Sequence, residues 1–302
     1  MTPDALLAAD LSRLLAEFPL LRTFGYAVAL MGALFLIILC VEAFSGGDIR
    51  RYRSRPFVTD ITYALIYQGG IYATLLQAPV FAVVALVVPS WNLDLLSNLP
   101  GPIGFLVYFV AADAIGYWIH RWQHRSPILW CFHNVHHSQT CLTFATSWRN
   151  HLAEQLFVNL LMHVPLMVLG MPKWYWAPVM LVQYVLEGLQ HSDLNWRYGR
   201  LYPVLVSPVF HAIHHSPERA RHDANYGKIL SVWDRLFGTL TTGERPARYG
   251  VAGMPTPVSF WATFMAPFGQ LKGRMLRQPP ISGVIRTTDP MSRALEIDLT
   301  KD

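Results

Sequence analysis

Long apolar runs separated by short polar segments dominate the first 120 residues of the chain. The first run, Phe24–Phe44, contains a single acidic residue, Glu42, near its end. About 20 residues of helix cross the hydrocarbon core of a bilayer, so this run is long enough to span a membrane. Two further runs, Ile61–Val88 and Gly101–Ile119, have the same character. Pro79 predicts a kink in the second of them.

A second apolar pair follows, Leu152–Met171 and Trp174–Leu189, with Pro172-Lys173 between its members. This pattern predicts a helical hairpin that either crosses the membrane or re-enters it from one side. Helices are expected because a spanning segment must satisfy its backbone hydrogen bonds internally. The predicted fold is an all-α integral membrane protein with about four or five transmembrane helices.

Arginines between the apolar runs indicate the orientation. They follow the first run (Arg50, Arg51, Arg53 and Arg55) and the third (Arg121 and Arg125). The loop Pro89–Pro100 between the second and third runs contains no Lys or Arg. The positive-inside rule places the arginine-bearing ends in the cytoplasm. The hairpin would return to that side, so the polar remainder predicts a cytoplasmic helical cap.

Composition supports a membrane protein. Of 302 residues, 53% are hydrophobic and only 14% are charged, against about 25% charged in average soluble chains. The net charge of +5 fits basic cytoplasmic loops, and no basic run interleaved with aromatic residues indicates nucleic-acid binding. The three cysteines form no CxxC pair, which argues against a disulfide framework or a thiolate metal site.

The chain divides by character into three expected regions. Residues 1–100 carry the N-terminal membrane helices, residues 101–240 the catalytic domain, and residues 241–302 a peripheral tail interrupted by prolines. The stretch Met1–Leu21 lacks the features of a signal peptide and predicts a short amphipathic helix.

Histidines recur at helical spacing in three places. They are HRWQH (His120, His124), HNVHH (His133, His136, His137) and HAIHH (His211, His214, His215). Residues at i, i+3 and i+4 are neighbours on the surface of a helix, and neutral imidazole binds Fe, Zn, Cu and Ni. Eight imidazoles exceed what one ion with an open position can use, so two metal ions are expected. A single histidine at a membrane interface is often merely amphipathic, but that reading does not account for the repeated spacing.

The choice of metal rests on chemistry. Neither the ExxH ligands of soluble di-iron bundles nor the HExxH of zinc proteases occurs. Iron can change its redox state and zinc cannot, so a histidine-only site beneath apolar helices favours oxygen chemistry on a lipid. A histidine-ligated zinc membrane protein, hydrolytic or structural, is the alternative. A metal carrier or sensor would instead distribute its ligands along the spans.

These motifs, with Gln190-His191, Asp223–Gly227 and Trp233–Thr239, resemble the fatty acid hydroxylase/sterol desaturase superfamily. The resemblance covers roughly residues 113–240. It implies an integral-membrane, non-haem di-iron oxygenase that hydroxylates, desaturates or cleaves the ether bond of a lipid. It also implies O2 as co-substrate and electrons from an external donor: a reductase, or a cytochrome b5-like or ferredoxin-like protein.

The resemblance also implies nine metal ligands: His120, His124, His133, His136, His137, His191, His211, His214 and His215. Some members of the superfamily carry another histidine four residues after the position of His191, where this chain has Asn195. One metal is then either a ligand short or coordinated through a water molecule held by Asn195.

Other polar residues are candidates to support the ligands. Asp113, two helical turns before His120, is expected to orient a ligand imidazole, or else to bond a neighbouring Tyr or Trp. Asp223, Asn225 and Tyr226 resemble the superfamily's DxNYG element and are expected beside the metals. Glu187 is expected either to support the metals or to form a buried pair.

Three histidines outside the motifs have alternative readings. His151, followed by Glu154, caps a helix or supports the metal shell. His163 forms an interhelical hydrogen bond or binds metal, and His222 is expected to be solvated.

Overall fold

The computed structural model describes residues 19–276 apart from residues 92, 94, 171–175, 253 and 255–258. These residues form helices joined by loops, with one isolated antiparallel bridge between Leu205 and Leu230 and no strand. The predicted all-α fold is confirmed over this part of the chain. The expected amphipathic helix at Met1–Leu21 and the end of the tail lie largely outside the described residues.

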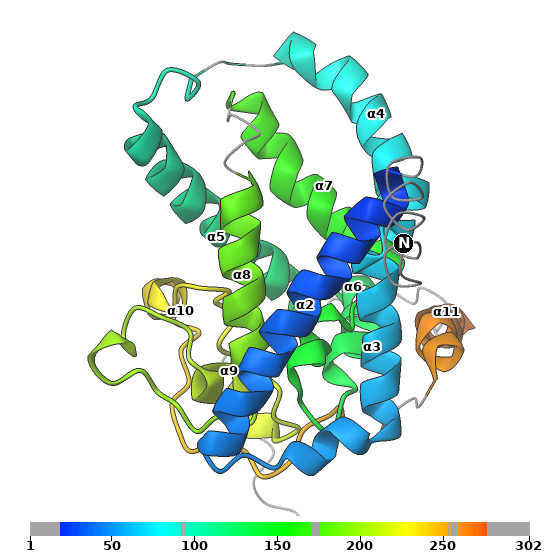
Figure 1. Cartoon of the computed structure of the whole chain (residues 1–302), viewed down its shortest axis with the longest axis vertical. Helices are drawn as coiled ribbons and strands as arrows, with labels where there is room; N and C mark the ends of the chain where they lie inside the picture. Colours follow the sequence, from blue (N-terminus) through cyan, green and yellow to red (C-terminus); the bar gives the residue numbers. More distant parts are fainter. Residues whose placement is uncertain are drawn as a thin grey trace, which may run out of the picture.

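The helices form two layers (Figure 1). The upper layer contains α4 (Ala78–Val87), α5 (Gly101–Arg125), α7 (Leu152–Val168) and α8 (Trp176–His191). Two helices, α2 (Pro19–Phe44) and α3 (Arg55–Gln68), run down along the side of the lower layer. The lower layer contains α6 (Pro127–His137), α9 (Pro208–His214), α10 (Val232–Leu236) and the loops around them. The last described helix, α11 (Phe260–Leu276), packs on α6 and α3.

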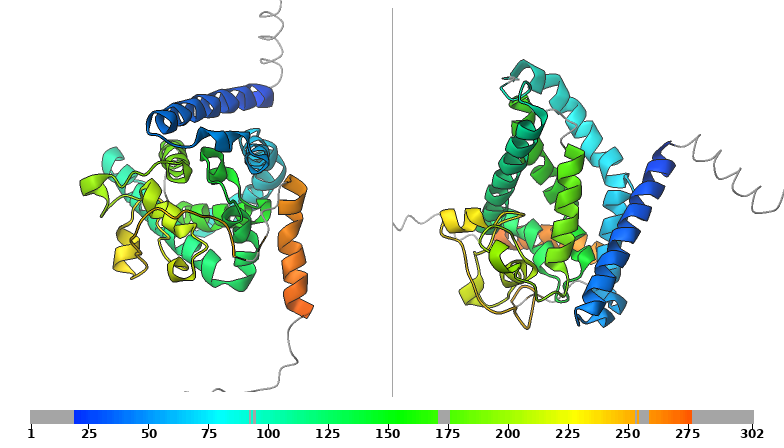
Figure 2. Two further views of the ribbon diagram at one scale, coloured as in Figure 1. Left: turned by 90° about the horizontal axis from the view of Figure 1, so that it is seen from below. Right: turned by 60° about the vertical axis from the view of Figure 1, so that its left-hand side comes forward.

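Short helical turns connect these elements. They are η1 (Ile49–Arg53), η2 (Ala73–Gln77), η3 (Val88–Trp91), η4 (Phe144–Trp148), η6 (Gly199–Leu201) and η7 (Arg219–Arg221). Seen from below, α2 and α11 lie along different sides of the lower layer, and the second view shows the long helices rising from it (Figure 2). The lower ends of the long helices therefore meet the lower layer.

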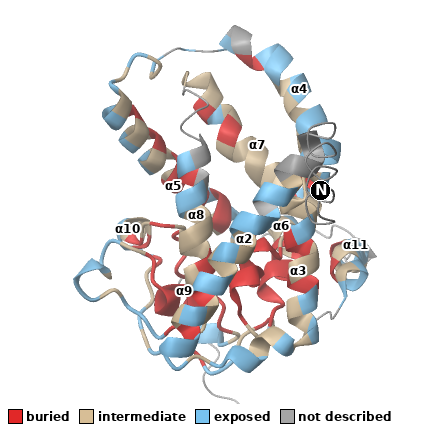
Figure 3. Cartoon of the chain, viewed as in Figure 1, coloured by how far each residue is buried: buried red, intermediate tan, exposed pale blue. Residues whose placement is uncertain are grey.

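Burial separates the two layers (Figure 3). Buried residues concentrate in the lower layer, whereas the long helices expose large apolar side chains such as Leu36 (58% exposed), Leu86 (82%) and Leu106 (60%). Apolar surface of this extent requires a non-aqueous environment. The upper layer therefore has the character of a membrane domain, which agrees with the composition.

Two helices are long and apolar enough to cross a membrane, Phe24–Phe44 and Gly101–Arg125. The bent pair Arg55–Gln68 and Ala73–Val87 makes a third candidate if its two parts form one span. The helices of the hairpin are shorter, with 17 residues in α7 and 16 in α8. Length and composition of the described helices thus support two or three spans.

The bend in the second span was expected at the wrong residue. The two parts meet at 51°, and the break lies at Gly69 and Gly70 rather than at Pro79. Gly70 adopts a positive φ of 77°, a conformation that ends a helix easily only at glycine. Pro79 instead lies inside the helical stretch of residues 71–87, two residues after the π-helical turn η2, and does not mark the break.

The two histidine-bearing helices of the lower layer begin in the same way. Ser126 precedes Pro127 at the start of α6, and Ser207 precedes Pro208 at the start of α9. Each serine hydroxyl accepts a hydrogen bond from the backbone N–H three residues later. Serine at the cap and proline in the first turn are the preferred residues for a helix start. Local sequence therefore sets where both helices begin.

A buried ion pair fixes α3 to the lower layer. Arg149 Nη1 lies 2.7 Å from Asp60 Oδ1, and both side chains are fully buried. Arg149 Nε also donates to the carbonyl of Val135 on α6, and Gln139 Nε2 donates to Asp60. Because an unpaired charge at this depth would be costly, the network ties α3, α6 and the loop after it into one arrangement.

Candidate metal centre

The nine predicted ligands lie together at the junction of the two layers, in two groups. One group contains His120, His124, His133, His137 and His214, and the other contains His136, His191, His211 and His215. Within each group, one nitrogen from every ring lies within 4.8 Å of the others. With metal–nitrogen bonds of about 2.0–2.1 Å, opposite ligands of one ion are ~4 Å apart. Each group can therefore enclose one ion.

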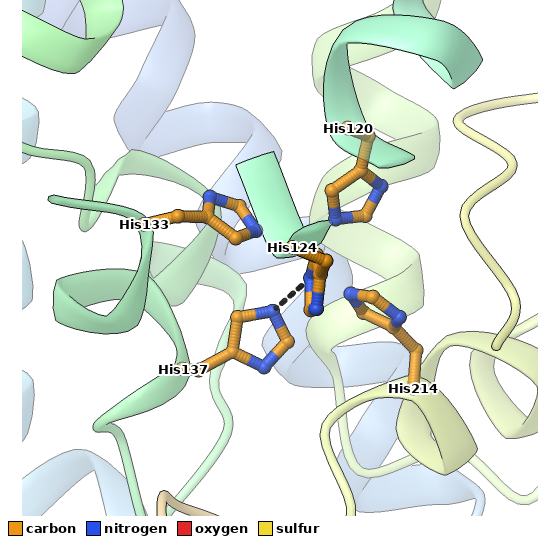
Figure 4. A group of neighbouring side chains, drawn as sticks. All are labelled: His120, His124, His133, His137 and His214. Carbon is orange, nitrogen blue, oxygen red and sulfur yellow. Dashed lines mark hydrogen bonds between the residues drawn. The ribbon is translucent and has the colours of Figure 1, made fainter. Parts of the chain in front are cut away.

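The five-histidine group is drawn from three helices (Figure 4). His120 and His124 lie one turn apart at the lower end of α5, His133 and His137 lie one turn apart on α6, and His214 is on α9. The Nε2 atoms of His124 and His137 are 3.1 Å apart. The rings converge on a common point.

The four-histidine group combines His136 of α6, the last residue of α8 and two residues of the α9 segment. His191 Nε2 lies 3.2 Å from His136 Nε2 and 2.9 Å from His211 Nε2, and His211 and His215 Nε2 are 3.1 Å apart. The rings of His137 and His215 stack at 4.4 Å between centroids. This contact places the two groups side by side.

The donor atoms of the five-histidine group fit a metal ion. Among the described residues, Nε2 of His133 and of His214 are buried without a hydrogen-bond partner, whereas most buried polar atoms in proteins have one. In the four-histidine group the Nε2 atoms instead face one another at 2.9–3.2 Å. A metal ion at each point of convergence would bind these nitrogens.

Burial also keeps the imidazoles in the form that binds metal. Desolvation lowers the pKa of His214 to about 3 and holds the pKa values of His136, His137, His211 and His215 well below their usual range. Neutral imidazole is the ligand form. The protein therefore presents uncharged donors at neutral pH.

Three rings of the five-histidine group are oriented by oxygen atoms that contact the ring nitrogen facing away from the centre of the group. His120 Nδ1 lies 2.9 Å from the carbonyl oxygen of Tyr226, and His214 Nδ1 lies 2.7 Å from that of Ala224. His133 Nδ1 lies 2.6 Å from Glu154 Oε1. Because these oxygens accept a hydrogen bond from Nδ1–H, they leave the lone pair of Nε2 free to bind a metal ion.

The predicted DxNYG element forms the loop that supplies two of these carbonyls. Asp223 and Asn225 have positive φ values of 57° and 60°. Asn225 bonds to Phe210 and Thr241 through its side chain, and the hydroxyl of Tyr226 donates to the exposed Asp223. Asn225 and Tyr226 thus hold the loop beside the histidines, whereas the exposed Asp223 accepts from the Tyr226 hydroxyl.

Asp113 does not orient a ligand, contrary to the first of its two readings. Its carboxylate accepts hydrogen bonds from the backbone N–H of Ile229 and of Leu230 and from the indole of Trp233. Two helical turns place it about 10 Å from His120 along the axis, too far to reach the ring. The second reading of Asp113, a hydrogen bond to a neighbouring Tyr or Trp, is the one observed. These bonds tie α5 to the segment that follows the DxNYG element.

Asn195 is exposed and lies away from the buried histidines. The helix α8 ends at His191, so the residue four positions later does not share its face. The prediction that Asn195 holds a water ligand therefore finds no support in the geometry. The four-histidine group thus has one histidine fewer than the five-histidine group.

The remaining histidines lie outside both groups. His151 caps α7, because its Nδ1 accepts the N–H of Ala153. His163 is buried with its ring 6.1 Å from that of Phe81. His222 is exposed, as expected. The cap reading of His151 is confirmed.

Two supporting carboxylates were not predicted from the sequence. Glu154 was assigned to a helix start, yet it also accepts from His133 and from Gln123. Asp234 was noted only as part of the Trp233–Thr239 motif, yet it accepts from the backbone N–H of Tyr226 and of Gly227. A glutamate at the third position of a capping box, three residues after His151, was the available signal for the first.

A cavity of about 300 Å³ reaches the histidines from the upper layer. Its walls include histidines of both groups: His120, His133, His136, His191 and His211. It extends between α5, α7 and α8 as far as Tyr108, His163 and Val179. A substrate in this cavity would contact both groups.

Known proteins share these features. The fatty acid hydroxylase family profile matches residues 105–239. An ornithine lipid hydroxylase of Rhizobium tropici is 31% identical over 71% of this chain and 66% of its own length. The human alkylglycerol monooxygenase is 29% identical over 59% of this chain and 43% of its own, and Arabidopsis thaliana methylsterol monooxygenase 1-3 is 28% identical over 44% and 46%. No solved structure matches the chain.

Helical architecture and two buried groups of histidines therefore occur together with a match to a known family of lipid-acting proteins. Residues 105–239 of this chain form a fatty acid hydroxylase domain. The chain spans from just over two fifths to about two thirds of the length of these three relatives.

Proposed function

We propose that this protein is a membrane-bound, O2-dependent lipid oxygenase with two iron ions. The observation that carries the proposal is the convergence of nine buried imidazoles into two groups at the inner end of a membrane-facing cavity. The relatives named as hydroxylases and monooxygenases support the same chemistry. Hydroxylation or desaturation of a fatty-acyl, sterol or related lipid C–H bond is the proposed reaction class.

Iron would supply O2 activation, and the chain's own residues would supply position and environment. In hydroxylation one oxygen atom enters a C–H bond and the other leaves as water, with two electrons and two protons completing the balance. Tyr226, Ala224 and Glu154 hold imidazole rings with Nε2 toward the metal. The cavity would bind the lipid against both groups and exclude bulk water.

The metal ligands are proposed as the nine histidines of the two groups, His120, His124, His133, His137 and His214 with His136, His191, His211 and His215. Zinc is not favoured, because a redox-inactive ion would not serve the oxygen chemistry of the relatives. The catalytic domain is proposed as residues 101–240, with membrane helices in residues 1–100 and a peripheral segment in residues 241–302.

The proposed topology is multi-pass, with about four or five crossings and the histidines on the cytoplasmic side. It is supported by the position of η1, whose arginines lie at the histidine end of the molecule. Arg51 donates to the carbonyl of Leu142 and pairs with Asp193, two residues after His191. Under the positive-inside rule this end is cytoplasmic, where a reductase, cytochrome b5-like or ferredoxin-like donor could supply electrons.

The test is a comparison of lipid extracts from cells with and without the gene, under air and under nitrogen. A product that requires both the gene and O2, and that disappears in the His136→Ala variant, supports the proposal. Iron content of the purified protein is measured in parallel. Identical lipids in wild-type and His136→Ala cells under air, or purified protein with zinc and no O2-dependent product, would refute it.

A further inference from the structure

The lining of the cavity beside the histidines is part apolar and part polar, and it contains many hydrogen-bonding groups although it lies between apolar helices. Five carboxamide side chains line it above the level of the histidines: Gln68, Gln77, Gln155, Asn159 and Gln183. Some bond to one another or to tyrosines, as Gln155 does to Asn159 and Asn159 to the hydroxyl of Tyr72. Others, including Gln77 and Gln183, make no hydrogen bond with the described residues. The cavity therefore has spare hydrogen-bonding capacity.

A pair of opposite charges stands next to the four-histidine group. Lys228 Nζ lies 3.5 Å from Glu187 Oε1, and both residues line the cavity. Glu187 is one turn above His191 on α8, and its carbonyl oxygen accepts from His191 Nδ1. Well-formed charged hydrogen bonds are about 2.7–2.9 Å long, so the two groups are loosely paired. Each can bind an opposite charge of a ligand.

A buried donor also faces this space. Trp148 is only 5% exposed and lines the cavity, and its indole N–H has no hydrogen-bond partner among the described residues. Buried tryptophan N–H groups usually find an acceptor. A carbonyl or carboxylate oxygen of a bound molecule would provide one.

Pure hydrocarbon does not fit such a lining. A chain or a sterol ring in this position would leave the carboxamides, the indole and the charged pair facing apolar atoms. Sites built to hydrogen-bond a ligand discriminate strongly against analogues that lack the matching groups. The lining therefore selects for a polar end of a lipid beside the metals.

We propose that the cavity recognises a lipid by a zwitterionic headgroup, with Glu187 receiving its ammonium group and Lys228 its anionic group. This inference rests on the proposed function and deepens it by naming the substrate class. Because the charged pair adjoins the histidines, the oxidised carbon belongs to the headgroup or to the first carbons of the attached chain. An amino-acid lipid and an aminophospholipid share this chemistry and differ only in the anion.

Lipid binding tests the proposal without requiring turnover. The iron-loaded full chain in nanodiscs is titrated with four probes of matched hydrophobicity: an N-acyl amino-acid lipid with free ammonium and carboxylate, phosphatidylethanolamine, a 1-O-alkylglycerol and cholesterol. At least one zwitterionic probe is expected to bind about tenfold or more tightly than the other two. The stronger of the zwitterionic probes identifies the anion as carboxylate or phosphate.

Side-chain variants locate the preference. Glu187→Gln and Lys228→Met are each expected to remove most of the preference for zwitterionic probes. The iron content is expected to remain unchanged, because the backbone contacts of both residues are retained. The double variant Glu187→Lys with Lys228→Glu is expected to restore part of the preference. Glu218→Gln, which removes the same charge from a surface ion pair with Arg221, is the matched control.

Several results would overturn the inference. Equal or tighter binding of cholesterol or alkylglycerol by the wild type would do so directly, even if a variant failed to fold. An unchanged preference in Glu187→Gln and Lys228→Met proteins that retain iron would do so as well. Headgroup-selective binding without any O2-dependent product would count against the proposed function alone. An O2-dependent sterol product without headgroup preference would count against this inference alone.

Discussion

The two histidine groups differ in how the protein holds their rings. In the five-histidine group, His120, His133 and His214 are each fixed through Nδ1 by a carbonyl or carboxylate oxygen. In the four-histidine group only His191 has such a partner, the carbonyl of Glu187. The Nδ1 atoms of His136, His211 and His215 are buried with no partner among the described residues.

This difference has a physical consequence. Outer partners fix the tautomer and orientation of a metal-binding imidazole, so the five-histidine group is organised by the protein before metal arrives. The four-histidine group is held mainly by packing and would gain more order from its ion. We therefore expect the second site to bind iron less tightly and to be the one that changes coordination during the reaction.

The largest effect is expected from removing one ligand in each group. His137→Ala and His215→Ala should each lower O2-dependent product formation more than about 100-fold, since loss of an outer partner alone costs ~10–100-fold. Iron measured per chain by mass spectrometry should fall further in His215→Ala, where three ligands remain, than in His137→Ala, where four remain. Equal iron loss in both variants would contradict the comparison.

Removing the carboxylate behind His133 should come next. Glu154→Ala is expected to weaken iron binding at the five-histidine group roughly 10–100-fold, because His133 and Gln123 both lose their acceptor. Glu154→Gln keeps an acceptor oxygen and should lie between this variant and the wild type. Iron dissociation constants measured against a competing chelator provide the readout. Glu218→Gln on the surface is the control, and unchanged affinity in Glu154→Ala would remove Glu154 from the support of the site.

When the wild type is treated with a chelator, the two histidine groups should release iron at different rates. This difference is expected to be smaller than the effects of the substitutions above. We expect two phases of iron release that differ roughly tenfold in rate, with the four-histidine group releasing first. Stopped-flow absorbance of the chelator complex follows the release. The fast phase should be absent in His215→Ala and present in His137→Ala. A single phase in the wild type, or the reverse assignment, would break the comparison.

The smallest effects are expected from replacing two glycines whose backbone lies close to neighbouring atoms. Gly188 lies beside the four-histidine group and Gly227 beside the five-histidine group. A Cβ on Gly188 of α8 would lie 2.3 Å from the Phe144 ring, and one on Gly227 would lie 2.7 Å from the carbonyl oxygen of Leu230. Alanine at either position should destabilise the fold by about 1–3 kcal/mol while retaining most activity at low temperature. Thermal unfolding of the iron-loaded protein measures this loss.

Gly269→Ala on α11 is the matched control, since a Cβ there meets nothing within 4 Å. If the contacts are specific, Gly188→Ala should accelerate iron loss from the four-histidine group, and Gly227→Ala from the five-histidine group. Stability equal to that of the control in both variants would show that the backbone approaches are not needed.

Much of the fold could be predicted because membrane helices follow from local composition. The apolar runs identified the end of α2 at Phe44 and the start of α5 at Gly101, while the other ends of these helices lie five and six residues beyond the runs. The serine–proline pairs mark the starts of α6 and α9. The break of the second span was misplaced, because its position depends on a glycine in a positive-φ conformation and not on the proline. The short α7 and α8 leave their crossing of the membrane as a prediction.

The supporting residues were harder to predict than the ligands. Asp113 was expected at an imidazole, but a helix fixes its distance from His120, and its partners come from a loop more than a hundred residues later. Asn195 was expected near His191, but α8 ends at that histidine. Such partnerships depend on where separate elements meet, which residue spacing does not encode.

The sequence by itself determined the membrane character, the helical fold and the identity of the histidines, because apolar length and i, i+3, i+4 spacing are local properties. Only the tertiary structure decided how the histidines divide. On α6 the i and i+4 rings join the five-histidine group and His136 joins the other, whereas on α9 the i and i+4 rings join the four-histidine group and His214 crosses over. At about 100° per residue, the i+4 ring lies ~40° to one side of ring i and the i+3 ring ~60° to the other side. One motif can therefore serve two ions once the helices face each other.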